Sequence, residues 1–369
     1  MTPFLEKFHP NQTIPAFADA LGISNSSQAN ILHLVAGNLF GGIERMLITI
    51  GLNANICPGV KHSFAVCYSG KFTSKMRAKE FSIHEFGKAS FRNLFSLCLA
   101  RHNFRKYLSK NKFDWIICHG SWIHALFGRC IRKSGISFAH MIHGISKSLS
   151  RQDQWSRLNL PDLVLANSQA TLATAKMIFP EVRHKVVYPP CELTNGMAKP
   201  DLRKKIREDY WVQPGQFVIF SASRLEAGKG IDILIEGLGQ IKDKPHWVCW
   251  VGGSPQRKSD SLYLNELKKM ADRVGVGSRI RWLGHVEDMH GHFSAADVYC
   301  QPNRLPESFG ITFVEAQSMG CPVITTGFGG ALEVVEDNGI NTLLAKPCPD
   351  LLAKALEKHL LMSARHAAP

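Results

Sequence analysis

The sequence lacks cysteine pairs and long apolar runs. Its ten cysteines are scattered and none forms a C-x-x-C pair, so the pattern indicates reduced cysteines, not a disulfide framework or a zinc site. No apolar run approaches the roughly 20 residues that a membrane span needs. The first residues, MTPFLEKFHPNQTIPAF, lack the basic and apolar parts of a signal peptide. We therefore expect a cytoplasmic protein, whose contact with a membrane, if any, is peripheral and at the inner face.

Two familiar nucleotide-binding motifs are also missing. Gly41 and Gly42 follow an apolar run, where glycine lets a backbone approach a ligand closely, but they do not belong to a G-x-G-x-x-G fingerprint. The stretch around Lys229 lacks the first glycine of a P-loop, and Gly230 replaces its Ser or Thr. These absences argue against a dinucleotide site and against a P-loop.

The balance of charge is strongly positive. Lysine and arginine number 44 against 30 acidic residues, which gives a formal charge of +14 and a pI of about 9.4. Residues 61–112 hold twelve of these cations, interleaved with phenylalanines, and only two acids. This field favours an anionic membrane surface or an anionic glycan, while a solvated helix face is the plain alternative. No nucleic-acid-binding motif accompanies the charge, so nucleic acid is not an expected partner.

Apolar strand-like runs alternate with helical stretches along the chain, which predicts an α/β fold with mostly parallel sheets covered on both faces. The pattern restarts after a Pro/Gly-rich stretch near 189–200, and 369 residues are more than one core usually holds. We expect a loose N-terminal extension (1–30) and two doubly wound domains (31–195 and 196–369). The expected strands lie at 31–37, 62–70, 81–87, 114–120, 137–145, 162–171 and 184–193, then at 217–225, 246–253, 280–286, 297–303 and 322–330.

Two glutamates bracket the segment PESFGITFVEA, residues 306–316. Glu307 follows a predicted strand, and Glu315 lies one turn into the next predicted helix, so both are expected at the carboxyl edge of the sheet where ligands bind. A carboxylate can accept hydrogen bonds from two hydroxyls of a sugar, and the amides at a helix start favour phosphate oxygens. The plain alternative is an acid that complements the helix dipole.

A second segment, SRLEAGKG (223–230), adds two cations at the same predicted edge. Arg224 closes a strand and Lys229 precedes a helix. Arginine offers a rigid fork and lysine a compact charge, a combination suited to a diphosphate. A polar turn with a solvated lysine is the alternative.

These segments resemble the donor-site signature of retaining glycosyltransferase family 4, the glycosyl transferases group 1, which have the GT-B fold. The resemblance runs from about 31 to 346. It rests on GGIER (41–45), MIHG (141–144), SASRLEAGKG (221–230), VGG (251–253) and the block ADVYCQPNRLPESFGITFVEAQSMGCPVITTGFGGALEVVEDNG (296–339). It implies two Rossmann-like domains facing a central cleft, the first on the acceptor side and the second binding a nucleotide sugar.

The resemblance also implies residue roles. Arg224 and Lys229 would bind the donor diphosphate, and Glu315 the ribose. His143 resembles the family's active-site histidine, with His119 and His140 as nearby competitors, and the acceptor-side loop would hold Gly41 and Gly42. The sugar and phosphates would be held by catalytic Glu307 and by the backbone of Ser308, Phe309, Gly310, Ile311 and Thr312.

The predicted function is transfer of a hexose-type sugar from a nucleoside diphosphate to a hydroxyl of a glycan or lipid-linked glycan, with retention of configuration, as in cell-surface polysaccharide or lipopolysaccharide synthesis. Family members usually need no metal, and no Asp-x-Asp pair stands in the matched segments, so we expect no metal or other cofactor. The chain ends about thirty residues after Gly339, which predicts a shortened C-terminal tail. Alternatives are a nucleotide-sugar epimerase or hydrolase on the same fold, or a non-catalytic subunit that binds a nucleotide sugar.

Overall fold

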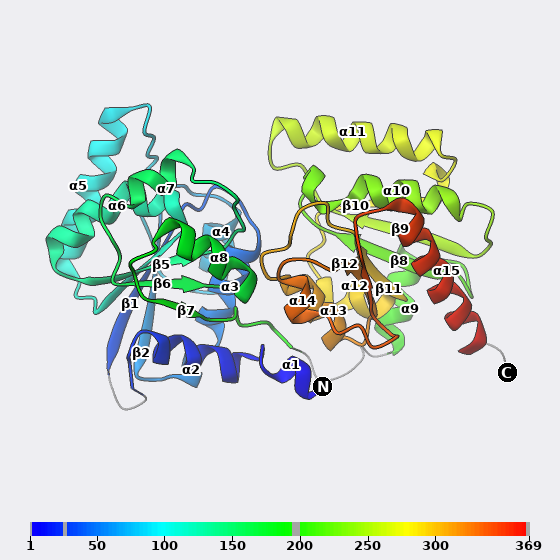
Figure 1. The fold of residues 1–369 in the computed structure, drawn as a ribbon, viewed down its shortest axis with the longest axis horizontal. Coiled ribbons are helices and arrows are strands. Elements are labelled where there is room, and N and C mark those ends of the chain that lie inside the picture. Colours follow the sequence, from blue (N-terminus) through cyan, green and yellow to red (C-terminus); the bar gives the residue numbers. More distant parts are fainter. Residues whose placement is uncertain (1, 25–27, 194–199, 367–369) are drawn as a thin grey trace. The chain divides into compact units, whose positions relative to one another are not determined.

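The computed structural model describes residues 2–24, 28–193 and 200–366, with side chains up to 363. The chain forms two units (Figure 1), one of residues Glu6–Glu192 and one of residues Met1–Leu5 with Leu193–Pro369. The domain boundary expected between 195 and 196 lies outside the described residues. Each unit is built on its own parallel sheet, which confirms the predicted α/β class with two doubly wound domains.

The N-terminal unit holds a seven-stranded sheet in the order β3-β2-β1-β4-β5-β6-β7. The strand order reverses at the neighbouring strands β1 and β4, which pair in parallel. The strands are β1 (Ala29–Val35), β2 (Val60–Val66), β3 (Ile83–Glu85), β4 (Trp115–His119), β5 (Ser137–Ile142), β6 (Leu163–Ala166) and β7 (His184–Val186).

Alternate residues of these strands enter two different cores, because successive side chains of a strand point to opposite faces. Ile31 and Val35 pack with residues of α2, α3 and α4, whereas Leu32 and Leu34 pack with residues of α5 and α6. Helices therefore cover both faces of the sheet. They are α2 (Pro10–Ala20), α3 (Gly42–Leu52), α4 (Lys71–Ala78), α5 (Leu94–Lys110), α6 (Ser121–Ser134), α7 (Arg151–Ser156) and α8 (Gln169–Ile178).

The predicted loose extension (1–30) is wrong. Residues of this segment form α1 (Pro3–Glu6) and α2, and β1 already begins at Ala29. Ile14 and Phe17 of α2 are 3% and 4% exposed and belong to the core under the sheet. Burial of this apolar face stabilises the helix despite the proline at 15 in its interior.

The C-terminal unit holds a six-stranded parallel sheet in the order β10-β9-β8-β11-β12-β13. Its strand order reverses between β8 and β11, which pair directly. The last, short strand was not expected from the sequence. The strands are β8 (Phe217–Ala222), β9 (Trp247–Gly252), β10 (Ile280–Gly284), β11 (Val298–Gln301), β12 (Val323–Thr326) and β13 (Thr342–Leu344).

Helices again cover both faces. Phe217 and Ile219 of β8 pack with α10, α11 and α15, while Phe220, on the opposite face, meets aromatic rings of α12 and β11. The helices are α9 (Pro200–Asp209), α10 (Ile231–Gln240), α11 (Lys258–Arg273), α12 (Met289–Ala295), α13 (Ile311–Ser318), α14 (Ala331–Val334) and α15 (Pro349–His366).

Among the described helices, none is both long enough and apolar enough to cross a bilayer.

Candidate functional site

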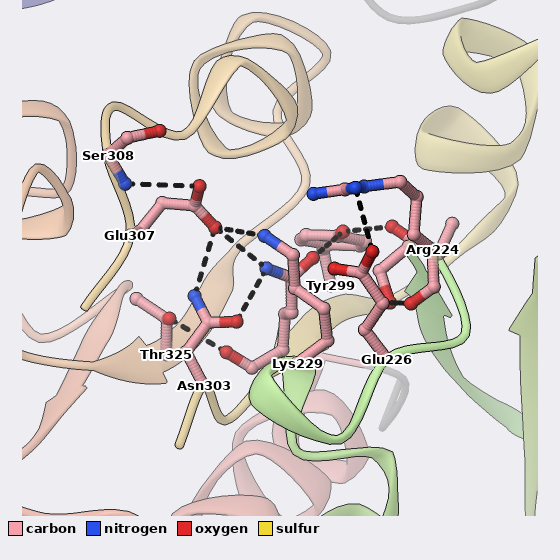
Figure 2. A network of polar contacts seen from close by, with 11 residues as sticks. Arg224, Glu226, Lys229, Tyr299, Asn303, Glu307, Ser308 and Thr325 are labelled. Carbon is pink, nitrogen blue, oxygen red and sulfur yellow. Dashed lines mark hydrogen bonds and ion pairs between the residues drawn. The ribbon is translucent and has the colours of Figure 1, made fainter. Parts of the chain in front are cut away.

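The strand-order reversal of the C-terminal sheet gathers the predicted donor-site residues. In open α/β sheets, ligands bind beyond the carboxyl ends of the strands at such a reversal. Arg224 and Lys229 lie in the loop that follows β8, and Glu307 lies in the loop that follows β11. Two segments some 80 residues apart in the sequence thus meet at one edge of the sheet (Figure 2).

Close backbone packing joins these two loops. Gly230 has a φ of 71°, and a Cβ there would overlap the carbonyl oxygen of Pro302, so only glycine fits. The carbonyl of Gly228 accepts hydrogen bonds from the N–H groups of Arg304 and Leu305, at 3.0 and 3.2 Å. These contacts fix the short 3-10 helix Ala227–Lys229 and therefore the start of the Lys229 side chain.

Glu307 is the centre of the polar network in Figure 2. Its Oε2 lies 2.7 Å from Nζ of Lys229 and accepts further bonds from the amides of Asn303, at 3.2 Å, and Gln301, at 3.3 Å. Its Oε1 accepts from the backbone N–H of Ser308 at 3.3 Å. The carboxylate is therefore held on both oxygens.

The environment keeps Glu307 ionised. Burial alone would raise the pKa of its carboxyl. The positive charge of Lys229, together with the hydrogen bonds from Lys229, Asn303 and Ser308, outweighs burial and holds the pKa below its usual range. A carboxylate that is ionised at neutral pH and hydrogen-bonded on both oxygens is suited to orienting hydroxyl groups, whereas a general acid would need a raised pKa.

Buried hydroxyls support this network from beneath. The hydroxyl of Tyr299 donates to the carbonyl of Ala222 and lies 2.8 Å from the side-chain Oε1 of Gln301. The main-chain carbonyl of Gln301 accepts a hydrogen bond from the hydroxyl of Thr325. Burial, in the first place, and then the charges of Glu307 and Glu315 raise the pKa of Tyr299, so it stays a neutral donor. Tyr299 therefore lies near both predicted carboxylates.

The second glutamate and the predicted backbone segment lie at the start of α13. Gly310 precedes the helix with a φ of 102°, a left-handed conformation that favours glycine. Ile311 and Thr312 open the helix, where the first amides have no partner within the helix. Glu315 lies one turn further and is 2% exposed. The side chain of Phe309 is also 2% exposed. We therefore expect Phe309 to contact a ligand through its backbone.

Arg224 is more exposed than Lys229 and carries its own counter-ion. Its guanidinium lies 2.7 Å from the carboxylate of Glu226, and the two side chains are 43% and 36% exposed. The motif-based prediction omitted Glu226 as well as Gln301 and Asn303. The signal for the last two was available, because both are polar residues at the end of the apolar strand DVYCQPN.

The other predicted residues lie in the N-terminal unit. His143 follows β5 and is partly buried, and its Nε2 lies 2.9 Å from Nδ1 of His119. Of its two competitors, His119 is this neighbour, whereas His140 is fully buried and pairs with His124. Gly41 and Gly42 precede and begin α3, and the N–H of Gly41 donates to Glu44 at 2.9 Å. The catalytic and binding roles of all these residues stay predictions.

The part of the chain with described side chains contains no group of three or more His, Cys, Asp or Glu residues arranged to hold a metal ion.

Residues 203–368 match the family model for glycosyl transferases group 1. Over this range, which is most of the C-terminal unit, the chain is similar to the group 1 glycosyltransferases. Human alpha-1,3/1,6-mannosyltransferase ALG2 is 28% identical over 216 residues, which cover 54% of this chain and 50% of ALG2. A GDP-mannose-dependent alpha-(1-6)-phosphatidylinositol monomannoside mannosyltransferase of Mycolicibacterium smegmatis is 31% identical over 191 residues, covering 49% of this chain and 48% of that enzyme. The chain spans about half the length of the curated relatives that it matches.

Solved structures extend the likeness to both units. Anabaena Alr3699/HepE, in complex with UDP and glucose, has a TM-score of 0.78 at 23% identity, covering 91% of this chain and 93% of that one. WaaG, a glycosyltransferase involved in lipopolysaccharide biosynthesis, has a TM-score of 0.65 at 16% identity, covering 91% and 94%. The predicted GT-B fold is thereby confirmed.

Proposed function

We propose that this protein is a group 1 glycosyltransferase, which transfers a hexose-type sugar from a nucleoside-diphosphate sugar to a hydroxyl of a glycan or lipid-linked glycan. The observation that carries the proposal is the contact between Lys229 and Glu307 at the strand-order reversal of the group 1 domain. It brings a cation for phosphate and a carboxylate for sugar hydroxyls to one place, which is what a sugar diphosphate requires.

The two loops and α13 bind different parts of the donor. Lys229 and Arg224 bind the diphosphate, the amides at the start of α13 bind its oxygens, and Glu315 accepts from the ribose hydroxyls. These fixed charges and dipoles also stabilise the negative charge that develops as the nucleoside diphosphate leaves. The proposed reaction uses no metal ion.

Glu307 acts on the sugar and not as a nucleophile. Four hydrogen-bond donors already hold its oxygens, so a covalent bond to the sugar would have to break this network. In the proposed retaining reaction, the acceptor oxygen attacks the anomeric carbon from the side on which the phosphate leaves. The bond from that carbon to the phosphate oxygen breaks, and the acceptor proton passes to the departing phosphate. His143 contacts the sugar or the acceptor.

The relatives indicate which donors and acceptors to test first. The mycobacterial enzyme is named as GDP-mannose-dependent and acts on a phosphatidylinositol mannoside, while the Anabaena protein was solved with UDP and glucose. GDP-mannose and UDP-glucose are therefore the first candidate donors, with lipid-linked glycans as the first acceptors.

The N-terminal unit offers a surface for peripheral contact with an anionic membrane at the inner face. Leu94 and Phe95, at the start of α5, are 72% and 79% exposed, and the cations Lys88 and Arg92 precede them closely. Exposed apolar side chains next to basic ones suit the boundary of an anionic bilayer. Sedimentation with vesicles that contain anionic lipid, compared between wild type and a Leu94→Ser, Phe95→Ser variant, tests this part.

The decisive test is a transfer assay. Purified protein is incubated with each donor, with and without a lipid-glycan extract, in the presence of EDTA, and release of the nucleoside diphosphate is measured. Acceptor-dependent release that Glu307→Gln abolishes, while diphosphate affinity stays within a few-fold, supports the proposal. Equal release without acceptor identifies a hydrolase, and binding without turnover identifies a non-catalytic subunit.

A further inference from the structure

Four histidines of the N-terminal unit lie on adjacent strands and form a continuous chain. His62 lies in β2, His33 in β1, His119 at the end of β4, and His143 just after β5. Because the sheet order is β2-β1-β4-β5, these residues lie on four neighbouring strands and cross the strand-order reversal between β1 and β4. The side chains share one face of the sheet.

Three hydrogen bonds connect the four rings head to tail. Nδ1 of His62 lies 3.0 Å from Nε2 of His33, Nδ1 of His33 lies 3.0 Å from Nε2 of His119, and Nδ1 of His119 lies 2.9 Å from Nε2 of His143. The two inner rings, His33 and His119, are 0% and 5% exposed, while the two terminal rings are partly exposed. Ring stacking between His33, His119 and His143 keeps the planes nearly parallel.

Burial keeps these imidazoles neutral. It lowers the pKa of His143 to about 3 and that of His62 to about 4, and burial with the neighbouring rings lowers the pKa of His33 and His119 well below the usual histidine value. A neutral imidazole has one N–H donor and one acceptor nitrogen. Each N···N hydrogen bond needs a single proton between its two nitrogens, so all four rings must carry their protons on the same kind of nitrogen.

We propose that His62, His33 and His119 are positioning residues that together fix which ring nitrogen of His143 carries the proton. With every proton on Nδ1, His143 presents an Nδ1–H donor outward. With every proton on Nε2, it presents an Nδ1 acceptor. The hydrogen bonds couple the tautomers of all four histidines. The tautomer of His62 therefore determines the tautomer of His143 at the other end of the chain of histidines. Use of that nitrogen in sugar transfer rests on the proposed function, but the linkage of the rings does not.

Nuclear magnetic resonance of the full chain with ¹⁵N-labelled histidine tests the linkage directly. We expect ¹⁵N–¹⁵N couplings across the three hydrogen bonds and one tautomer for each ring in the wild-type protein. Absence of the coupling between His119 and His143, with both rings assigned, would overturn the proposal. This measurement needs no variant and no substrate.

Two variants of His62 test whether the hydrogen-bonded histidines determine the tautomer of His143. His62→Phe keeps a stacked ring but removes the partner of Nε2 of His33, whereas His62→Gln keeps a hydrogen-bonding group. We expect His62→Phe to move the ring ¹⁵N signals of His143 toward a mixture of tautomers, and His62→Gln to restore most of the wild-type pattern. His102→Phe, at an exposed position on α5, is the matched control. Unchanged His143 signals in folded His62→Phe would refute the linkage.

Kinetics separate this linkage from the proposed reaction. If both hold, His62→Phe lowers kcat for transfer about tenfold, as loss of one hydrogen bond would, and leaves diphosphate affinity unchanged. If the spectra respond as expected but no donor is ever consumed, the chain of histidines stands and the proposed function fails.

Discussion

Glu307 shows how the candidate site combines charge with burial. Its side chain is 13% exposed and its only described ion pair is with Lys229. Removing one partner of such a pair leaves the other charge largely buried and unmatched, which usually costs more than the pair contributes. The pair is therefore both a feature of the proposed donor site and a structural contact.

Lys229→Met should lower the free energy of unfolding by about 1–3 kcal/mol at pH 7, because the Glu307 carboxylate then lacks its ammonium partner. Urea unfolding measures this. In the wild type, the stabilisation by ionised Glu307 is present above its unfolded pKa of about 4.3 and is lost as the pH falls through its lower folded value. Lys204→Met is the control, since the Lys204 side chain is 76% exposed. An equal, small effect of both substitutions would refute the assignment.

Gly230 allows the two site loops to touch, and its replacement by alanine should lower the melting temperature and weaken diphosphate binding together. The new Cβ would meet the backbone of Pro302, in addition to the strain of a positive φ. Gly215→Ala is a matched control, because its φ is 77° but no atom lies within 4 Å of the added Cβ. Similar losses of melting temperature in both variants would show that the loops do not depend on this contact.

The two motifs of the C-terminal unit allowed the sequence to predict Arg224, Lys229, Glu307 and Glu315 together, since strand ends of a parallel sheet share an edge. The chain of histidines was not predictable in the same way. Its hydrogen-bonded neighbours are 24 to 86 residues apart in the sequence, and only the strand order places them side by side. The counter-ion of Arg224, Glu226, was also missed, since a half-buried glutamate in a turn carries no distinctive sequence signal.

Helix α2 was missed for a physical reason. Proline disfavours a helix interior, and the segment contains Pro10 and Pro15. Pro10 occupies the first helical turn, where proline is tolerated, and the apolar positions Ile14, Phe17 and Ala18 have helical spacing. Packing of that apolar face against the sheet stabilises the helix although the segment contains two prolines. By contrast, the long alternation of buried strands and amphipathic helices was sufficient to predict both sheets.

Phe17→Ala should destabilise the N-terminal unit by about 3–5 kcal/mol, because the ring is 4% exposed and stacks on His33. Hydrogen–deuterium exchange of β1 amides reports the change. Phe95→Ala, at a side chain that is 79% exposed, should leave exchange in the unit nearly unaltered. If Phe17→Ala were equally silent, α2 would not be part of the core.

At the scale of the whole molecule, the two units differ in how many of their histidines have a lowered pKa. Burial lowers the pKa of seven histidines with described side chains in the N-terminal unit, namely His33, His62, His84, His119, His124, His140 and His143. In the described C-terminal unit, the pKa of His359 is lowered to about 4. These histidines favour the folded state fully above their unfolded pKa of about 6.5 and progressively less as the pH falls toward their folded values.

The N-terminal unit should therefore lose several kcal/mol of stability between pH 7.5 and 5.5, at most about 1.4 kcal/mol for each histidine per pH unit. Hydrogen–deuterium exchange at both values, corrected for intrinsic rates, should show loss of protection in β1, β2, β4 and β5 before β8 and β11. Equal loss in both sheets would contradict this unequal distribution.

We propose above that the edge between β8 and β11 binds a nucleoside diphosphate through Arg224 and Lys229. Isothermal titration of GDP and UDP into the purified chain in EDTA, beside an Arg224→Gln, Lys229→Gln variant, tests it most directly. We expect one site for one of the two nucleotides and a loss of at least about 100-fold in affinity in the variant, since each charge-assisted contact contributes about 1.5–3 kcal/mol. Equal affinity in a folded double variant, or no binding of either nucleotide to the wild type, would show that this edge is not a donor site.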